Sequence, residues 1–321
     1  MKEFQLIRQI QQETSVPTSK TSDRGVLLGI GDDAAVLEMP AGQSLVAATD
    51  TLNAGTHFPV DTLPFDIAYK CLAVNLSDLA AMGAKPRWAL LSLSLPGVDS
   101  KWVRSFTAGF NALARIHDVT LVGGDTTSGP LSVSLTALGT IEPGAQLTRK
   151  GAQPGHMLVV SGTIGGAARV LELLQADERV SEQHLLDRPQ PRVKLGQALV
   201  GYASACIDIS DGLLADLGHL LKASGCGARV ELETLPHADV LAGLDDDLKW
   251  KNQLSGGDDY ELLFTLPADH KSLLTTLSQQ LDVRLSIIGE IELEKNIRCL
   301  KPDGSLYKPR TAGFEHFRQQ T

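Results

Sequence analysis

The first half of the chain mixes short apolar runs with longer amphipathic stretches, which predicts a domain of strands and helices. Residues 1–12 have the spacing of a short amphipathic helix, and Pro64 opens a longer helix, 64–82, that ends before Gly83. A second long helix is predicted over 99–117. Apolar runs bounded by Gly, Asp or Pro predict strands at residues 26–30, 34–38, 44–49, 88–97, 120–125 and 131–141.

The second half restarts the same mixture after a segment rich in glycine and proline. Residues 142–155 hold three Gly and two Pro, and this composition favours a domain boundary. Helical patterns follow at 165–176, 191–202 and 211–224, and strand patterns at 157–162, 205–209, 228–232, 259–266 and 284–290. The sequence therefore predicts a mixed α/β fold with two domains, residues 1–143 and 144–321.

Composition and charge narrow the class of protein. With 321 residues, of which 43% are hydrophobic and 21% charged, the chain suits two globular domains. Its net charge of -9 argues against a nucleic-acid backbone as partner, although metal ions allow a nucleotide ligand. The four cysteines form no CxxC pair, which indicates a reducing compartment, and no apolar run is long enough to span a bilayer. We therefore expect a cytoplasmic protein with no membrane partner.

Aspartates that follow predicted strands are the main chemical signal. One aspartate at a strand end is usually a turn former, because its side chain hydrogen-bonds to nearby backbone. Five clusters of this kind in one chain are harder to explain by turns alone. The clusters are Asp32 with Asp33, Asp50, Asp125, Asp208 with Asp211, and Asp258 with Asp259.

Asp78 adds an acidic group to the helix predicted over 64–82. It shares one face with Cys71, Asn75 and Met82, and the residues near them are small or apolar. A carboxylate buried there is destabilising unless it is paired or binds a cation, and no basic residue lies on that face. This favours a metal ligand, with a structural aspartate that hydrogen-bonds a neighbouring loop as the alternative.

Carboxylates that converge repel one another unless hard cations neutralise them. Oxygen ligands with scarce His and Cys select Mg²⁺ or Mn²⁺, and Mg²⁺ often shares its ligands with substrate phosphates. A nucleotide site with several Mg²⁺ ions is therefore predicted. These residues alone do not identify the molecule that accepts the phosphoryl group. The dinucleotide fingerprint is matched superficially by residues 29–34 but would put Asp32 and Asp33 against the pyrophosphate, and no GxxxxGK[ST] is present. The turn SGTIGG could bind an anion or be a plain tight turn.

Eight segments in order resemble thiamine-monophosphate kinases, a family in the superfamily of aminoimidazole ribonucleotide synthetase. They are GIGDDAAV, ATDTLNAGTHF, KCLAVNLSDLAAMGAKP, LVGGDTT, LTRKGAQPG, IDISDGLLADLGHL, LSGGDDYELLF and GFEHF. Each segment is weak alone, but their order and spacing are highly specific. The resemblance implies the two-domain fold of that superfamily, in which an N-terminal mixed sheet with helices binds ATP and Mg²⁺ and dimerises. A C-terminal α/β domain then completes the nucleotide and substrate site.

The resemblance also implies an activity, which is ATP-dependent phosphorylation of thiamine phosphate to thiamine diphosphate by direct in-line transfer in a homodimer. The implied metal ligands are Asp33, Thr49, Asp50, Asp78, Asp125, Asp208 and Asp211. Nucleotide contacts are implied for Gly124, Asp125, Arg149 and Ser210, and contacts to thiamine phosphate for His57, Asp258 and Phe314. Asp50, Asp125 and Arg149 are the implied catalytic groups.

Several residues also have a plainer interpretation. Taken alone, Arg149 suits a solvated linker, His57 a packed histidine and Phe314 a core aromatic. The chain also departs from the family in two places. Ala48 stands where Ser is common, which is harmless if that ligand acts through its backbone carbonyl, and Asp258 stands where Glu is common, which shortens its reach.

Three other functions fit parts of the pattern. The first is another ATP-dependent member of the superfamily, similar to aminoimidazole ribonucleotide synthetase, and the second is a Mg²⁺-dependent phosphohydrolase. The third is a nucleotide-binding sensor that has lost turnover. Such a sensor would be expected to lack essential carboxylates, whereas this chain retains Asp33, Asp50, Asp78, Asp125 and Asp208.

Overall fold

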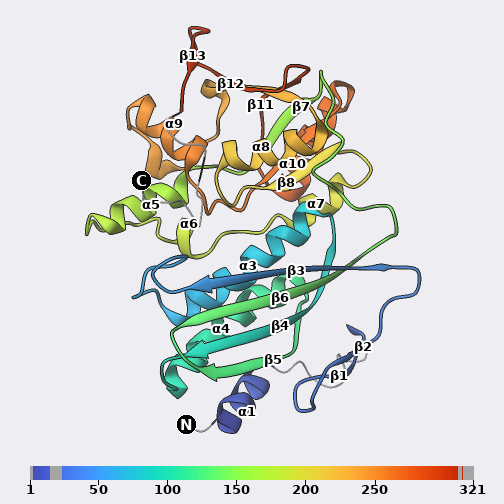
Figure 1. Cartoon of the computed structure of the whole chain (residues 1–321), viewed down its shortest axis with the longest axis vertical. Helices are drawn as coiled ribbons and strands as arrows, with labels where there is room; N and C mark the ends of the chain where they lie inside the picture. Colours follow the sequence, from blue (N-terminus) through green and yellow to red (C-terminus); the bar gives the residue numbers. More distant parts are fainter. Residues whose placement is uncertain (1–2, 15–23, 310–312, 314–321) are drawn as a thin grey trace. The chain divides into compact units, whose positions relative to one another are not determined.

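The computed structural model describes residues 3–14, 24–309 and 313 and divides into two compact units (Figure 1). The first unit is Met1–Leu79 with Ala84–Ala145, and the second is Ala80–Gly83 with Gln146–Thr321. Each unit is built around its own β-sheet.

The first unit contains a four-stranded mixed sheet. Its strand order is β3 (Ser44–Asn53), β6 (Ser132–Ile141), β4 (Lys85–Leu95) and β5 (Thr120–Ser128). β6 pairs antiparallel with β3 and β4, whereas β4 and β5 are parallel. Along β4 the buried Leu91, Leu93 and Leu95 alternate with the exposed Leu90 and Ser92. This two-residue period shows that one face of the sheet packs into the core and the other does not.

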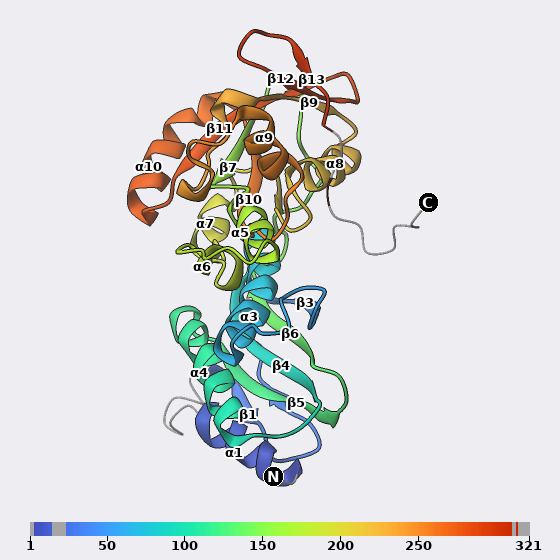
Figure 2. The same ribbon diagram turned by 90° about the vertical axis from the view of Figure 1, so that its left-hand side faces the viewer.

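Helices α3 (Pro64–Ala81) and α4 (Ser100–His117) cover the buried face of this sheet (Figure 2). They approach closely at Gly109, where a Cβ atom would lie 1.9 Å from the carbonyl oxygen of Phe65. The side chain of Asp99 caps α4 by accepting from the Lys101 amide, and Asp118 ends the helix in the left-handed conformation. Helix α1 (Glu3–Thr14) packs on α4 and β5, and β1 (Val26–Leu28) and β2 (Val36–Leu37) form a separate short hairpin.

The second unit contains a seven-stranded sheet. In spatial order its strands are β13 (Leu306–Tyr307), β12 (Ile297–Leu300), β9 (Gly227–Glu231), β11 (Leu285–Glu292), β7 (Met157–Ser161), β10 (Leu262–Leu266) and β8 (Ala205–Asp208). All neighbours are antiparallel except β12 and β9. Every residue of β7 and β10 is buried, as expected for central strands with both faces covered.

Helices pack around this second sheet. They are α5 (Gly166–Gln175), α6 (His184–Asp187), α7 (Val193–Leu199), α8 (Leu213–Ser224), α9 (Asp246–Ser255) and α10 (Lys271–Leu281), with the 3₁₀ helices η2 (Leu232–Thr234), η3 (Asp239–Leu241) and η4 (Ala268–His270). α8 and α9 contribute leucines and Trp250 to the main core, while α10 contacts β11 and α7. None of the described helices has the length and hydropathy needed to cross a bilayer.

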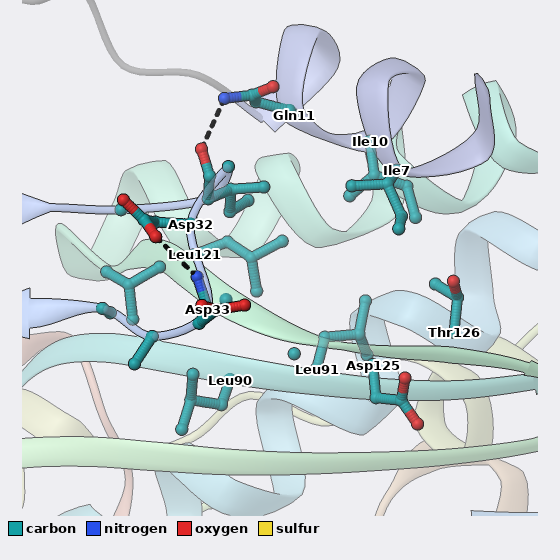
Figure 3. A pocket seen from close by; sticks show the side chains of 18 of the residues that line it. Ile7, Ile10, Gln11, Asp32, Asp33, Leu90, Leu91, Leu121, Asp125 and Thr126 are labelled. Atoms are coloured by element: carbon teal, nitrogen blue, oxygen red, sulfur yellow. Dashed lines mark hydrogen bonds between the residues drawn. The ribbon is translucent and has the colours of Figure 1, made fainter. Parts of the chain in front are cut away.

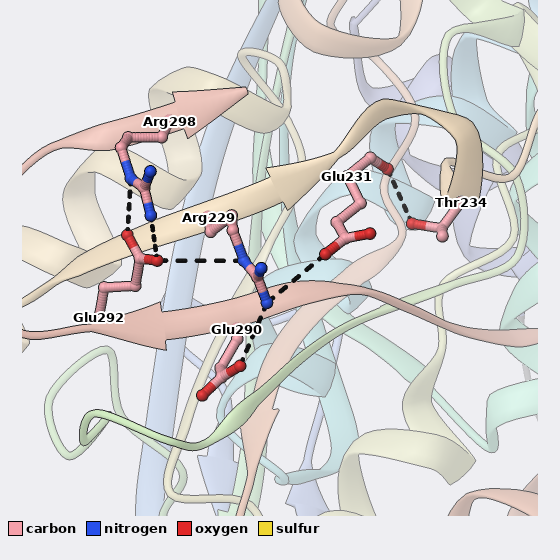
Figure 4. A network of polar contacts seen from close by, with 6 residues as sticks. All are labelled: Arg229, Glu231, Thr234, Glu290, Glu292 and Arg298. Carbon is pink, nitrogen blue, oxygen red and sulfur yellow. Dashed lines mark hydrogen bonds and ion pairs between the residues drawn. The ribbon is translucent and has the colours of Figure 1, made fainter. Parts of the chain in front are cut away.

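Ion pairs tie together the outer strands of the second sheet (Figure 4). Arg229 of β9 lies 3.3 Å from Glu290 and 3.5 Å from Glu231, and its Nε lies 4.0 Å from Glu292. Glu292 also accepts two hydrogen bonds from Arg298 of β12. These groups are partly exposed, so each pair stabilises the sheet only modestly.

The predicted mixed α/β fold is confirmed, while several predicted boundaries are wrong. β3 and β5 continue beyond residues 49 and 125, so Asp50 and Asp125 lie inside strands and not after them. Residues 259–261 form a loop before β10, not the first part of that strand. Helices α6, α9 and α10 and strands β12 and β13 were not predicted from the sequence.

Candidate active site

A pocket of about 1000 Å³ lies in the first unit between α1, the loop after β1, and strands β4 and β5 (Figure 3). This volume is at the upper end of the range for ligand pockets and is sufficient for a nucleotide. Three residues predicted to contact metal or nucleotide line it together, namely Asp33, Gly124 and Asp125.

The loop that carries Asp33 is fixed by two hydrogen bonds. Gln11 of α1 donates from Nε2 to the Ile30 carbonyl at 2.6 Å, and the Asp33 amide donates to Oδ1 of Asp32 at 2.9 Å. Asp32 therefore acts as a turn former, as the plainer interpretation of strand-end aspartates predicts. Both Asp32 and Asp33 line the pocket.

Gly124 sets the position of Asp125 on the edge strand β5. Its φ of +147° and the short distance to β4 require glycine, because a Cβ atom would lie 1.8 Å from the carbonyl oxygen of Leu91. Asp125 follows directly, opposite Ser92 in the parallel pairing with β4, and it is exposed.

We expect Gly124→Ala to lower the free energy of unfolding by about 2 kcal/mol or more, because the new methyl group overlaps backbone that cannot move independently. Urea denaturation measures this effect. Gly42→Ala is the matched control in the same unit, since Gly42 also has a positive φ, +74°, but no atom lies within 4 Å of the position its new methyl group would take. An equal loss in both variants would show that the close approach of β5 to β4 is unimportant.

Asp50 lies on the face of β3 that α3 covers. Burial raises the pKa of its carboxyl group, and burial, with an added contribution from the Asp50 charge, raises the pKa of the Cys71 thiol on α3. On the same helix Asn75 is fully buried, whereas Asp78 is half-buried. Asp50 therefore faces the helix that carries Asp78.

Thr49 points to the opposite face of the sheet, because successive side chains alternate along a strand. Its hydroxyl donates to the Leu135 carbonyl at 3.1 Å and accepts from the Thr136 hydroxyl at 3.0 Å. Thr49 and Asp50 cannot both bind one ion through their side chains, so a role for Thr49 would use its backbone carbonyl. Within the described parts of the chain, no three His, Cys, Asp or Glu side chains are grouped closely enough to hold a metal ion.

His57 lies in the turn that follows β3. Its Nδ1 accepts a hydrogen bond from the Asn53 amide at 3.0 Å, and the buried Lys70 donates from Nζ to the His57 carbonyl at 3.2 Å. The histidine is half-buried, and the hydrogen bond from Lys70 links its backbone to α3.

In the second unit, the end of β8 and two loops bring four predicted site residues together. Asp208 is the last residue of β8, the loop that follows carries Ser210 and Asp211, and the loop before β10 carries Asp258. The Asp258 amide donates to the Ser210 carbonyl at 2.9 Å. Predictions from separate parts of the sequence thus meet at one edge of the sheet.

Asp216 of α8 was missed in the sequence analysis. Its buried carboxylate accepts hydrogen bonds from the amides of Ser210 at 3.0 Å and Asp211 at 3.1 Å. Burial, with added repulsion from Asp208 and Asp211, raises its pKa to about 7. An acidic residue in the first turn of a predicted helix was the signal that could have revealed it.

At the SGTIGG turn, a backbone amide binds a carboxylate of the same chain, that of Asp259. The Gly165 amide, at the N-terminus of α5, donates to Oδ2 of Asp259 at 2.8 Å. Burial raises the pKa of Asp259, while hydrogen bonds from backbone amides act in the opposite direction. The turn is therefore neither a plain tight turn nor open to an outside anion at the Gly165 amide, because this amide is bound by a carboxylate of the chain itself.

An ion pair between the half-buried Arg192 and the buried Glu261 lies next to this cap and was not predicted from the sequence. Arg192 donates from Nε and from a terminal nitrogen to the two carboxylate oxygens of Glu261, at 2.6 and 2.5 Å. The Ser161 hydroxyl donates to the same carboxylate at 2.5 Å. The pair joins the start of α7 to the ends of β7 and β10.

The remaining predicted residues lie near the start and the end of the second unit. Arg149 is exposed, and its carbonyl accepts from the Ser224 hydroxyl at 3.0 Å. Phe314 lies outside the described residues. Its neighbour Gly313 packs against the loop after β8, where a Cβ atom would lie 2.7 Å from the Asp211 carbonyl oxygen.

Comparison with known proteins identifies the family. Residues 31–141 match the AIR synthase related protein, N-terminal domain, and residues 153–300 match its C-terminal domain. The chain is 46% identical over 308 residues to the thiamine-monophosphate kinase of Salmonella typhimurium, covering 93% of this chain and 94% of the relative. It is 41% identical to that of Haemophilus influenzae, covering 99% of each. The chain belongs to the thiamine-monophosphate kinase family.

Solved structures of this kinase family share the fold. The thiamine-monophosphate kinase of Stenotrophomonas maltophilia K279a is 45% identical, with a TM-score of 0.86 over 96% of this chain and 98% of that one. AaThiL complexed with AMPPCP and TMP is 30% identical, with a TM-score of 0.76 over 98% and 97%. The resemblance drawn from the sequence motifs is therefore confirmed.

Proposed function

We propose that the protein transfers the terminal phosphoryl group of ATP to thiamine phosphate and releases ADP and thiamine diphosphate, the last step of thiamine diphosphate biosynthesis. The observation that carries this proposal is the similarity, over nearly the whole chain, to AaThiL complexed with AMPPCP and TMP. That relative binds an ATP analogue and thiamine phosphate together, and its fold extends over both units of this chain.

The donor atoms of the described residues suit Mg²⁺. Asp33 and Asp125 line one pocket, Asp50 faces the helix of Asp78, and Asp208 ends β8 just before the loop of Asp211. These are hard oxygen ligands, with neither His nor Cys among them, and Mg²⁺ prefers such ligands. Bound Mg²⁺ would supply neutralisation of the ATP phosphates. We assign these residues, with the carbonyl of Thr49, as its ligands.

Phosphoryl transfer to a phosphate needs little proton transfer. The attacking oxygen of thiamine phosphate is already ionised at pH 7, so positioning and charge neutralisation contribute most of the rate enhancement. We assign Gly124, Asp125, Arg149 and Ser210 to nucleotide binding. The exposed Arg149 is free to extend its guanidinium group toward phosphate oxygens.

His57, Asp258 and Phe314 are assigned to thiamine phosphate. A carboxylate suits the positively charged thiazolium ring of this acceptor. We expect Asp258→Ala to raise the KM for thiamine phosphate about tenfold with little change in the KM for ATP, as initial-rate kinetics would show. Asp247→Ala is a matched control, since Asp247 is an exposed carboxylate of α9 in the same unit. Equal increases in both KM values would assign Asp258 to the nucleotide or metal instead.

A homodimer and a cytoplasmic location complete the proposal. The face of the first sheet opposite α3 and α4 carries the exposed Leu45 beside hydroxyl pairs such as Thr51 with Ser134. A second copy of this face is a suitable partner for it, and sedimentation velocity measures the resulting mass. All four cysteines are buried and unpaired with one another, which suits a reducing compartment.

Acceptor selectivity tests the proposed reaction against its alternatives. ADP formation from ATP and Mg²⁺ should require thiamine phosphate and should not occur with thiamine or formylglycinamidine ribonucleotide. Turnover of formylglycinamidine ribonucleotide would instead support an enzyme similar to aminoimidazole ribonucleotide synthetase.

A further inference from the structure

The loop of residues 256–261, which precedes β10, has an unusual backbone. Asp258 and Tyr260 both adopt positive φ angles, 69° and 52°. The other non-glycine residues with positive φ in the described chain are Asp118, Asp177 and Asp282, which lie at or next to the ends of α4, α5 and α10, where this conformation is ordinary. For a bulky residue such as tyrosine it is strained, and strain of this kind persists where the surrounding contacts enforce it.

Backbone hydrogen bonds fasten this loop to the loop after β8. The Asp258 amide donates to Ser210 at 2.9 Å, and the Tyr260 amide donates to Ile209 at 2.8 Å. The Ile209 amide in turn donates to the Glu261 carbonyl at 2.8 Å. These bonds continue the pairing of β8 with β10 beyond the end of β8 and before the start of β10, so Ser210 and Asp258 are held in register.

The side chains of the loop of residues 256–261 form two sets, one that binds the rest of the unit and one whose members bind each other. Asp259 caps α5, and Glu261 binds Arg192 and Ser161, so these two carboxylates anchor the loop to the rest of the unit. The buried Tyr260 instead turns back along the loop, and its hydroxyl donates to Oδ1 of Asp258 at 3.0 Å. This contact joins two residues that are only two positions apart and that both have positive φ angles.

We propose that Tyr260 is a positioning residue that fixes the Asp258 carboxylate for recognition of the acceptor. The inference rests on the proposed function and deepens it. Its hydroxyl donates to Oδ1 of Asp258 and so limits rotation of the side chain, which holds the carboxylate in one orientation. The anchored ring then ties acceptor recognition to the loop of Ser210, which we assign to the nucleotide.

The test is Tyr260→Phe, which removes only the hydroxyl and keeps the buried ring. We expect the KM for thiamine phosphate to rise about tenfold while the KM for ATP stays within about twofold, a loss of roughly 1.4 kcal/mol in acceptor binding. The melting temperature should change by no more than about 2 °C. Tyr202→Phe is the matched control, because Tyr202 is a half-exposed tyrosine of the same unit that contacts His270.

A double-mutant cycle separates positioning from general destabilisation. If Tyr260 acts through Asp258, Tyr260→Phe should have no further effect on the KM for thiamine phosphate in an Asp258→Ala background. Additive effects, an unchanged KM in the single variant, or equal rises in both KM values with a lower melting temperature would each overturn the proposal. Absence of thiamine diphosphate from the wild-type reaction would instead refute the proposed function itself.

Discussion

Replacing Asp50 with asparagine should lower kcat by about two or more orders of magnitude while the protein stays folded. The carboxylate is half-buried against α3, and burial raises its pKa, so the charged form is unfavourable there without a cation. An amide of the same shape avoids this desolvation penalty but cannot neutralise a metal ion. The free energy of unfolding should therefore be unchanged or slightly higher. The loss in kcat is a separate effect, in which each tenfold decrease corresponds to about 1.4 kcal/mol of lost transition-state stabilisation.

Asp118→Asn provides the matched control for this substitution. Asp118 also belongs to the first unit and ends α4 in the left-handed conformation, which asparagine tolerates equally well. Steady-state kinetics and thermal unfolding of both variants should distinguish loss of a metal ligand, expected only in Asp50→Asn, from loss of one negative charge, which both variants share. Near-normal turnover in Asp50→Asn would rule out Asp50 as a metal ligand.

Glu261→Ala should lower the free energy of unfolding by about 3–5 kcal/mol, because it leaves the Arg192 guanidinium partly buried without its partner. Glu261 is 6% exposed and accepts both hydrogen bonds of Arg192 together with that of Ser161. Urea denaturation measures the loss as a shift in midpoint. A fall in the acceptor affinity should accompany it, since Glu261 anchors the loop of Asp258.

Glu290→Ala is the comparison for this buried pair. Glu290 also binds an arginine, Arg229, at 3.3 Å, but both side chains are substantially exposed. Its removal should change the free energy of unfolding by no more than about 1 kcal/mol. Equal losses in the two variants would contradict the special role given to the Arg192–Glu261 pair.

Local pattern was enough to predict the long elements of the fold. α3 and α4 have clear helical periodicity and end signals, and both were located to within about two residues. β3 and β5 continue through Asp50 and Asp125 because pairing with β6 and β4 extends them beyond their apolar runs. The helix α9 was missed because its sequence, DDLKWKNQLS, has few apolar residues, although Trp250 and Leu254 are enough to pack it.

Some of the residues singled out from the sequence lie together in the structure. Asp33 and Asp125 line one pocket, and Asp258 lies beside Ser210. By contrast, Arg192 and Glu261 are 69 positions apart, and nothing in the local pattern pairs them. Contacts of this kind depend on how distant strands and helices pack, so they become visible only in the folded chain.

One measurement tests the central claim most directly. The purified protein would be incubated with ATP, Mg²⁺ and thiamine phosphate, and the products would be separated and quantified. The account predicts thiamine diphosphate and ADP in equal amounts, with both abolished by a chelator. Binding of ATP without formation of ADP, or release of phosphate from thiamine phosphate, would contradict it.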